Sequence, residues 1–407
     1  MIAFLSGAAL SILPILFVLG LVVTVHELGH FLVARWLGVA VDRFSIGFGR
    51  PLLMWTDKAG VEWRLGWIPL GGYVRFAGDA EASSSVPDAE SLERLKSEIQ
   101  SREGRGEEQK YFHFKPVWVR AAVAAAGPIA NFVLTVVLFS SLLLAMGEMV
   151  VTPRIGSVEP NSPAARAGFM KGDVVTAVDG RQITDFSELQ RHVSLRTGQA
   201  IQFEVQRGPT ALTLVATPER RLQVNPLTGG SAHVGVLGVM NSGDPKDVYH
   251  RRYNPPQAVV ASVKRAYDIL DSTVFYLGRL VRGLESGDQL GGPLRTAQIS
   301  SAVAKAGVDG GKDFGSRLGG ATLNLLNLTA VLSVGIGFMN LLPVPVLDGG
   351  HLLFYAFEAV FRRPLGARVQ AAGYRVGLAL LLGLMLFATW NDLQQLSVFK
   401  TLAGLFS

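Results

Sequence analysis

The sequence contains no cysteine and has few charged residues for its length. Without cysteine the chain forms no disulfides and offers no thiolate to a metal, so a metal site must use histidine and carboxylate ligands. Only 17% of the 407 residues are Asp, Glu, Lys or Arg, whereas 49% are hydrophobic. This balance is too apolar for an ordinary soluble protein and indicates several membrane spans joined to a soluble part.

A concentrated basic patch is also missing. The net charge is +6, and the basic residues are spread near the ends of apolar runs. We therefore interpret them as membrane-topology signals and expect no nucleic-acid partner. The N-terminus lacks the basic region of a signal peptide, so we expect none to be cleaved.

One apolar segment nevertheless carries ionisable residues. Residues 23–34 read VTVHELGHFLVA and contain the pattern H-E-x-x-H. On a helix, His26 and His30 lie on one face and can bind one metal ion. A catalytic zinc takes three protein ligands and keeps a water, for which Glu27 is a suitable general base. Two histidines satisfied by their neighbours are the alternative, but ionisable residues in a membrane-length helix are costly and usually functional.

Hydropathy divides the rest of the chain into spans and polar segments. The predicted spans are 1–38, 117–148, 321–351 and 372–390. Residues 39–77 are rich in glycine and aromatics and predict short β-hairpins with turns at 57–60 and 71–72. Their apolar character favours a β-element that dips into the membrane over a peripheral hairpin. The predicted cytoplasmic loops are 78–116 and 352–371, and 391–407 is a tail.

Residues 150–222 read as a soluble domain. RIGSVEP and KGDVVTAVDG predict strands, SPAARAG and TDFSELQRHV predict capped helices, and QAIQFEVQRG with TALTLVATP predicts a hairpin. Such a unit can bind an extended peptide along a strand beside its helix. Residues 223–320 are expected to be a linker with an amphipathic helix near 255–285 and a glycine-rich, small-residue segment.

Arginine placement predicts the topology. Arginines follow the first span, open the second, and lie between the third and fourth; these are Arg35, Arg43, Arg50, Arg64, Arg75, Arg120, Arg362, Arg363, Arg368 and Arg375. The positive-inside rule puts these loops in the cytoplasm and the 150–222 domain outside. Spans one and three then run in the same direction, so Asp348 reaches the depth of the two histidines. We expect Asp348 to be the third ligand, although His351 is close enough in sequence to compete.

Three motifs together resemble the site-2 protease family of intramembrane zinc metalloproteases. They are HELGH at 26–30, GPIAN at 127–131 and NLLPVPVLDGGH at 340–351. The resemblance covers nearly the whole chain and is closest to the bacterial RseP type. We find one PDZ-like unit where some members of the family carry two. From the residues alone, we expect Gly127, Pro128 and Asn131 to serve helix packing.

The resemblance implies a fold and a set of site residues. The fold is a polytopic α-helical membrane protein with about four transmembrane helices, a membrane-reentrant β-hairpin loop at 39–77 and an inserted extracytoplasmic PDZ-like α+β domain. One Zn²⁺ would be bound by His26, His30 and Asp348, with Glu27 as the catalytic base. The segment that helps to hold the substrate strand would include Asn340, Pro343 and Pro345.

The implied activity is regulated cleavage of single-span membrane proteins near the cytoplasmic side of the bacterial inner membrane. Expected substrates are a trimmed anti-sigma factor or remnant signal peptides, and the expected state in the lipid bilayer is a monomer with its PDZ domain in the periplasm. Two alternatives stay open: a non-catalytic PDZ scaffold and a zinc transporter. A scaffold has no need of Glu27, and a transporter would spread its ligands along several spans.

Overall fold

A computed structural model describes residues 2–78, 89–224, 231–285, 287 and 290–395. Parts of the predicted polar loop (79–88), linker (225–230, 286, 288–289) and tail (396–407) lie outside these residues. The chain forms two compact units. One consists of Met1–Phe139 with Gly292–Trp390, and the other of Ser140–Gly291 with Asn391–Ser407.

Within the described residues, four helices are long and apolar enough to cross a membrane, as predicted. They are α1 (Ile2–Trp36), α3 (Val117–Met146), α8 (Phe314–Leu341) and α10 (Ala367–Gln395). Helix α8 begins earlier than position 321 because Asp313 and Ser316 form a capping box. It ends at Leu341 and does not reach residue 351, because Pro343 and Pro345 cannot continue a helix.

A separate helix, α9 (Asp348–Phe361), follows the proline-containing turn. Asp348 was expected at the inner end of the third span, and this expectation is corrected. Asp348 is the first residue of α9, with Leu347 at the N-cap. Gly349 and Gly350 allow this arrangement, because a β-carbon at either position would lie 2.3 Å from a backbone carbonyl oxygen of the preceding turn.

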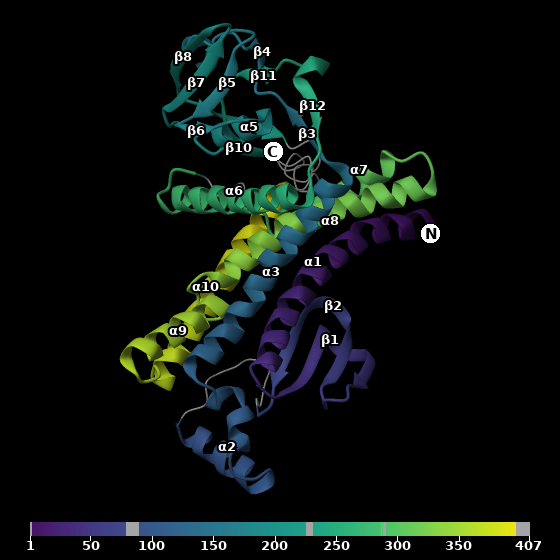
Figure 1. Ribbon diagram of the computed structural model, residues 1–407, viewed down its shortest axis with the longest axis vertical. Coiled ribbons are helices and arrows are strands. Elements are labelled where there is room, and N and C mark those ends of the chain that lie inside the picture. Colours follow the sequence, from purple (N-terminus) through teal and green to yellow (C-terminus); the bar gives the residue numbers. More distant parts are fainter. Residues whose placement is uncertain (1, 79–88, 225–230, 286, 288–289, 396–407) are drawn as a thin grey trace, which may run out of the picture. The chain divides into compact units, whose positions relative to one another are not determined.

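Helices α1, α3 and α8 lie side by side through small residues and polar bridges (Figure 1). A β-carbon on Gly29 would come within 2.4 Å of the Ala126 carbonyl oxygen, so α1 and α3 are in very close contact. The Ser333 hydroxyl of α8 donates to the Asn131 carbonyl oxygen of α3 at 2.9 Å. Such contacts are how membrane helices associate where apolar burial gives no advantage over lipid.

A further helix occupies the predicted small-residue segment. Helix α7 (Pro293–Asp309) starts with proline in its first turn and packs against α8 and α1. Small residues permit this packing, since a β-carbon on Gly307 would lie 2.4 Å from the Ala321 backbone nitrogen. The polar loop contains helix α2 (Ala89–Arg102).

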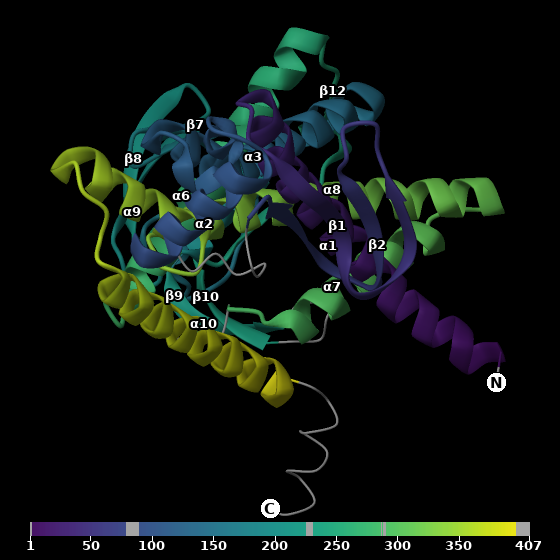
Figure 2. The same ribbon diagram turned by 90° about the horizontal axis from the view of Figure 1, so that it is seen from below.

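Strands β1 (Val41–Thr56) and β2 (Glu62–Phe76) form an antiparallel hairpin beside α1 (Figure 2). Each strand bends back on itself. Ser45 of β1 is paired with Arg64 on one side and Tyr73 on the other, while Trp55 is paired with Trp63. The predicted turn at 57–60 occurs. No separate turn forms at 71–72, which belong to β2; this strand folds back between Leu65 and Gly72, so the first half of β1 lies between the two halves of β2.

The second unit contains the strands expected around residues 150–222. Strands β5 (Val174–Val178), β6 (Arg181–Gln182), β7 (Ile201–Arg207) and β8 (Thr210–Ala216) form one antiparallel sheet in the order β6-β5-β7-β8. Helix α4 (Pro163–Arg166) is capped by Ser162, and helix α5 (Phe186–Ser194) by Asp185. These elements enclose a core that includes Val175, Leu189 and Phe203.

Three two-stranded ribbons accompany the sheet in the described part of this unit. They pair β3 (Glu148–Val151) with β12 (Val248–Arg251), β4 (Ile155–Val158) with β11 (Val239–Asn241), and β9 (Glu219–Val224) with β10 (Ser231–Val236). The amphipathic helix expected near 255–285 is α6 (Pro255–Val281), which Asn254 and Gln257 begin with a capping box. Strands β3 and β12 thus pair at the two ends of the segment that carries all the other strands of this unit.

Candidate metal centre

Three predicted ligands from two helices converge at one point. Nε2 of His26 lies 3.1 Å from Oδ2 of Asp348, and Nε2 of His30 lies 3.6 Å from Oδ1 of the same carboxylate. The two Nε2 atoms are 3.2 Å apart. Among the described residues this is the one group of three or more His, Asp and Glu side chains with donors close enough to share a metal ion.

The spacing of these donors suits zinc. A tetrahedral Zn²⁺ with bonds of about 2.0–2.1 Å separates its donor atoms by roughly 3.3 Å. The two imidazole nitrogens, 3.2 Å apart, match that value, and the Asp348 carboxylate approaches them at 3.1 Å through Oδ2 and at 3.6 Å through Oδ1. Two histidines and one carboxylate also leave a fourth position for water or substrate, which is the composition of a hydrolytic zinc site.

Helix α3 orients both imidazoles. Nδ1 of His30 lies 2.7 Å from the Val123 carbonyl oxygen. Because a carbonyl can only accept, Nδ1 carries the proton, and Nε2 keeps a lone pair directed toward His26 and Asp348. This is the usual outer partner of a metal-bound histidine.

Asn131 performs the same task for His26. Its Nδ2 lies 3.2 Å from Nδ1 of His26, and its Oδ1 is buried without a hydrogen-bond partner. The amide oxygen and nitrogen are nearly indistinguishable in shape, so exchanging them places Oδ1 where it accepts a hydrogen bond from the Nδ1–H of His26. That orientation satisfies the buried oxygen and leaves Nε2 of His26 free to bind a metal.

The expectation that Asn131 and Gly127 serve packing alone was too narrow. A β-carbon on Gly127 would lie 2.3 Å from Nε2 of His30 and 2.8 Å from Cε1 of His26. Gly127 therefore gives the two imidazoles their space. The available sequence signal was the polar Asn131 four residues after Gly127, which places both on one face of the second span.

Glu27 occupies the side of the centre next to the hairpin. Its carboxylate is within hydrogen-bonding reach of the Val74 backbone, and a β-carbon on Gly72 would lie 3.2 Å from its Cγ. Glu27 thus adjoins the His–His–Asp group without belonging to it. Its place between the donors and strand β2 is appropriate for a base that acts on a molecule held at the metal.

Comparison with known proteins agrees with this geometry. The family model of Peptidase family M50 matches residues 14–384. Metalloprotease MmpA of Caulobacter vibrioides is 46% identical over 401 residues, which cover 98% of this chain and 100% of the relative. A candidate zinc metalloprotease of Agrobacterium fabrum is 41% identical over 393 residues, 97% of each chain. Another, from Mesorhizobium japonicum, is 44% identical over 386 residues, 94% of this chain and 98% of its own.

The chain belongs to peptidase family M50. The resemblance to site-2 proteases that HELGH and NLLPVPVLDGGH indicate is therefore confirmed. In this M50 peptidase, the motifs near the two ends of the chain supply the three converging donors.

The other motif residues lie just before Asp348. Asn340 is in the last turn of α8, and Pro343 and Pro345 lie in the segment that joins α8 to α9. Pro343 is exposed, whereas Pro345 packs against α10, where β-carbons on Gly373 and Gly377 would be 3.3 Å from its ring. Pro345 therefore also fixes the turn that precedes Asp348.

His351, the competing ligand, lies outside the converging group. Its Nδ1 is 3.4 Å from the Tyr374 hydroxyl of α10, and the two ring centres are 5.8 Å apart. The structure thus favours Asp348 as the third donor.

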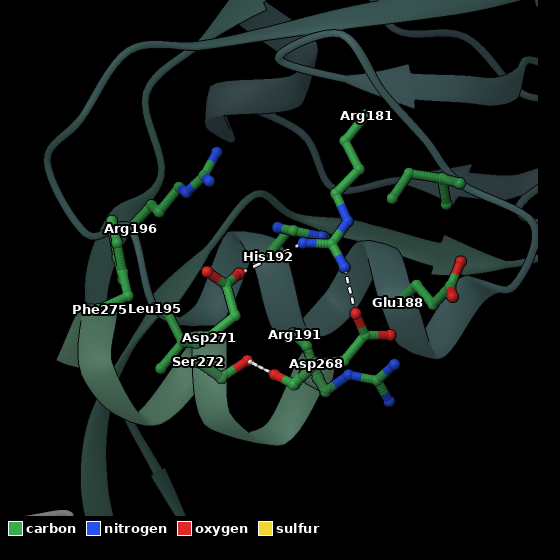
Figure 3. A pocket seen from close by; sticks show the side chains of 11 residues that line it. Arg181, Glu188, Arg191, His192, Leu195, Arg196, Asp268, Asp271, Ser272 and Phe275 are labelled. Atoms are coloured by element: carbon green, nitrogen blue, oxygen red, sulfur yellow. Dashed lines mark hydrogen bonds and ion pairs between the residues drawn. The ribbon is translucent and has the colours of Figure 1, made fainter. Parts of the chain in front are cut away.

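A second group of ionisable residues lines a pocket between α5 and α6 (Figure 3). Arg181 pairs with Asp268 and with Asp271. Burial lowers the pKa of His192, and the nearby charges of Arg196 and Arg181 lower it further. Because both aspartates of the pocket pair with Arg181, we interpret it as a packed contact between α5 and α6 and not as a metal site.

Proposed function

We propose that this M50 peptidase is an intramembrane zinc metalloendopeptidase. His26, His30 and Asp348 would hold one Zn²⁺, and Glu27 would act as general base. The observation that carries the proposal is the convergence of His26, His30 and Asp348 side chains, 3.1–3.6 Å apart, with Glu27 directly beside them. The relatives named as zinc metalloproteases support the choice of metal.

The chemistry follows from the placement of these side chains. Zinc, when bound, polarises the scissile carbonyl and lowers the pKa of a water to about 7. Glu27 accepts the proton of the attacking water and passes it to the departing amine nitrogen. Val123 and Asn131 keep the imidazoles in the tautomer that binds metal.

The proposed substrates are single-span membrane proteins, such as a trimmed anti-sigma factor or remnant signal peptides. Within the described residues, the segment 72–76 of β2 is paired with β1 along one side only. An unwound substrate could pair along its other side, next to Glu27. Asn340, Pro343 and Pro345 would support the strand from the opposite end of the site, as the family resemblance implies.

We further propose that residues 39–77 form a membrane-reentrant hairpin and that the 150–222 unit is a PDZ-like domain in the periplasm of a bacterial inner-membrane protein. The hairpin exposes large apolar side chains such as Leu52, Trp55 and Trp67, which suit lipid contact. Arginines beside the spans support a cytoplasmic position for the hairpin and for the loop after α9.

The two alternatives fit the site less well. A transporter would need donors along a path, but these three share one point. A scaffold would need neither the oriented histidines nor an adjacent carboxylate. A peptidase uses all four side chains.

The proposal is tested by co-expressing the chain with a panel of tagged single-span proteins. Glu27→Gln should abolish cleavage, by at least the ~10²–10⁴-fold typical of a general base, while the purified variant keeps its zinc. Exposed Glu98→Gln on α2 is the matched control and should cleave normally. Cleavage by Glu27→Gln near the wild-type rate would defeat the assignment.

A further inference from the structure

A half-buried ion pair joins α3 to α9 at a distance from the metal centre. Nη2 of Arg120 lies 2.6 Å from Oε1 of Glu358, and these side chains are 14% and 18% exposed. Glu358 follows Asp348 by ten residues on the same helix, roughly 15 Å along its axis. The sequence explains Arg120 as a topology charge, which does not require this partner.

Arg120 makes two further contacts that fix its position. Its guanidinium lies over the Tyr355 ring, 5.1 Å from the centre, and its Nε donates to the Lys115 carbonyl oxygen at 3.1 Å. A planar guanidinium that is both stacked and paired defines one arrangement of α9 on α3. An ammonium on a flexible chain would define it less well.

Tyr355 connects Arg120 to the hydrophobic core that packs next to the metal centre. It is buried and belongs to the cluster that contains Phe31 of α1 and Val123 of α3. Tyr355 lies seven residues, about two turns, after Asp348 and therefore on the same face of α9. The face that presents Asp348 is the face held by Arg120 and the cluster.

Helix α3 also supports both histidines. Val123, whose carbonyl oxygen accepts a hydrogen bond from His30, is three residues after Arg120, and Asn131 contacts His26 farther along the same helix. The Arg120–Glu358 pair thus anchors the aspartate-bearing helix to the helix that orients the imidazoles.

We propose that Arg120 and Glu358 are positioning residues that set Asp348 against His26 and His30, and so tune metal affinity and coordination from a distance. This inference rests on the zinc site of the proposed function. Loss of the pair would let α9 shift, which would move the carboxylate while both histidines stay in place.

The test measures metal binding by the detergent-solubilised full chain. Zinc affinity is obtained by competition with a chelator, and coordination from the visible spectrum after Co²⁺ is substituted. Arg120→Gln and Glu358→Gln should each weaken zinc binding about tenfold, the lower limit seen for outer-shell partners, and should alter the Co²⁺ spectrum. The charge-swapped pair, Arg120→Glu with Glu358→Arg, should recover much of both.

Two controls separate positioning from topology and from general charge loss. Arg120→Lys keeps the topology charge but loses the planar guanidinium, so it should show an altered spectrum while membrane orientation is unchanged. Arg102→Gln, which removes an exposed ion pair with Glu98, should leave affinity and spectrum at wild-type values.

The outcomes are distinct. If the wild-type chain binds metal and every variant matches it, the positioning role is wrong while the zinc site stands. If the single variants lose metal and the charge-swapped pair recovers none of it, specific positioning by this pair is likewise rejected. If the wild-type chain itself binds neither Zn²⁺ nor Co²⁺, the proposed function falls as well.

Discussion

Gly127 on α3 lies so close to His30 on α1 that a β-carbon at position 127 would be 2.3 Å from the imidazole Nε2. The same β-carbon would be 2.8 Å from Cε1 of His26. Both imidazoles therefore pack directly against the backbone of Gly127, which has no side chain to separate them from α3. The space beside the metal donors depends on a missing side chain as much as on the donors themselves.

Gly127→Ala should therefore lower zinc affinity and proteolysis together. The added methyl must displace either an imidazole or α3, because contacts below 3.0 Å are not tolerated. Zinc content of the purified protein, measured by mass spectrometry, is the readout. Gly335→Ala on α8 is the matched control, since nothing lies within 4 Å of its β-carbon. Equal zinc content in the two variants would contradict the crowding.

Asn131→Ala should weaken zinc binding by about 10–100-fold, because His26 loses the partner that fixes its tautomer. Asn131→Asp keeps an oxygen at that position and should retain more affinity than the alanine variant. Chelator competition measures both. Asn324→Ala, which alters an amide elsewhere on a spanning helix, should have no effect on metal binding.

Asp348→Ala should remove zinc along with activity, whereas His351→Ala should mainly spare zinc. The carboxylate lies at 3.1 and 3.6 Å from the two imidazoles, while His351 contacts Tyr374. Zinc-to-protein ratios after dialysis distinguish the two. Zinc kept without Asp348 and lost without His351 would transfer the third-ligand role to His351.

Much of the metal centre could be predicted from the sequence. The i, i+4 spacing of His26 and His30 defines a helical face by itself. The choice of Asp348 needed a second argument, the shared depth of two spans, because no local pattern links residues so far apart. In the structure, Asp348 reaches the histidines as the first residue of a new helix that begins after Pro345. An argument from membrane depth alone cannot tell this arrangement from an aspartate at the end of a span.

Other features could not be predicted because they depend on packing between distant segments. The role of Asn131 requires knowing that α1 and α3 approach closely at Gly29. The folded-back pairing of β1 with both halves of β2 depends on register, which alternation alone does not fix. The sequence before α8 is rich in glycine and other small residues and follows a glycine-rich turn, which indicates a linker, so it does not predict helix α7.

The stability of the 150–222 unit should depend on pH through Asp173. Burial would raise the pKa of this carboxyl, but hydrogen bonds from the Arg207 guanidinium and the Met170 backbone outweigh burial and lower it. A lowered folded-state pKa stabilises the fold above about pH 4, the unfolded value, and this stabilisation is lost as the pH falls through the folded value.

Hydrogen exchange of β5 and β7 in the full chain measures this effect. Protection should be steady at neutral pH, after correction for intrinsic exchange rates, and should fall only under acidic conditions. Arg207→Ala should lower this protection, because the buried Asp173 carboxylate then loses the guanidinium that pairs with it. Undiminished protection in this variant would show that the pair does not hold the sheet.

Removing the 150–222 unit should loosen substrate selection without abolishing chemistry. Residues 152–247 can be replaced by Asn-Gly, a turn suited to a two-residue hairpin, because Val151 and Val248 are already paired. Short substrates should still be cut, and substrates with bulky outer domains should become accessible. A recruiting module predicts weaker binding and no new substrates instead. If the shortened protein keeps its membrane fold but cuts no substrate, the unit does more than restrict access and this prediction is wrong.

The pairing of β3 with β12 has a consequence for how this family can diversify. The entering and leaving chains are held side by side, at the ~5 Å spacing of paired strands, before the rest of the unit begins. Any segment inserted between Val151 and Val248 therefore begins and ends at two neighbouring strands, one of which follows α3 in the chain while the other precedes α6. A domain inserted in this way can be exchanged, doubled or lost in evolution without moving the residues of the metal centre.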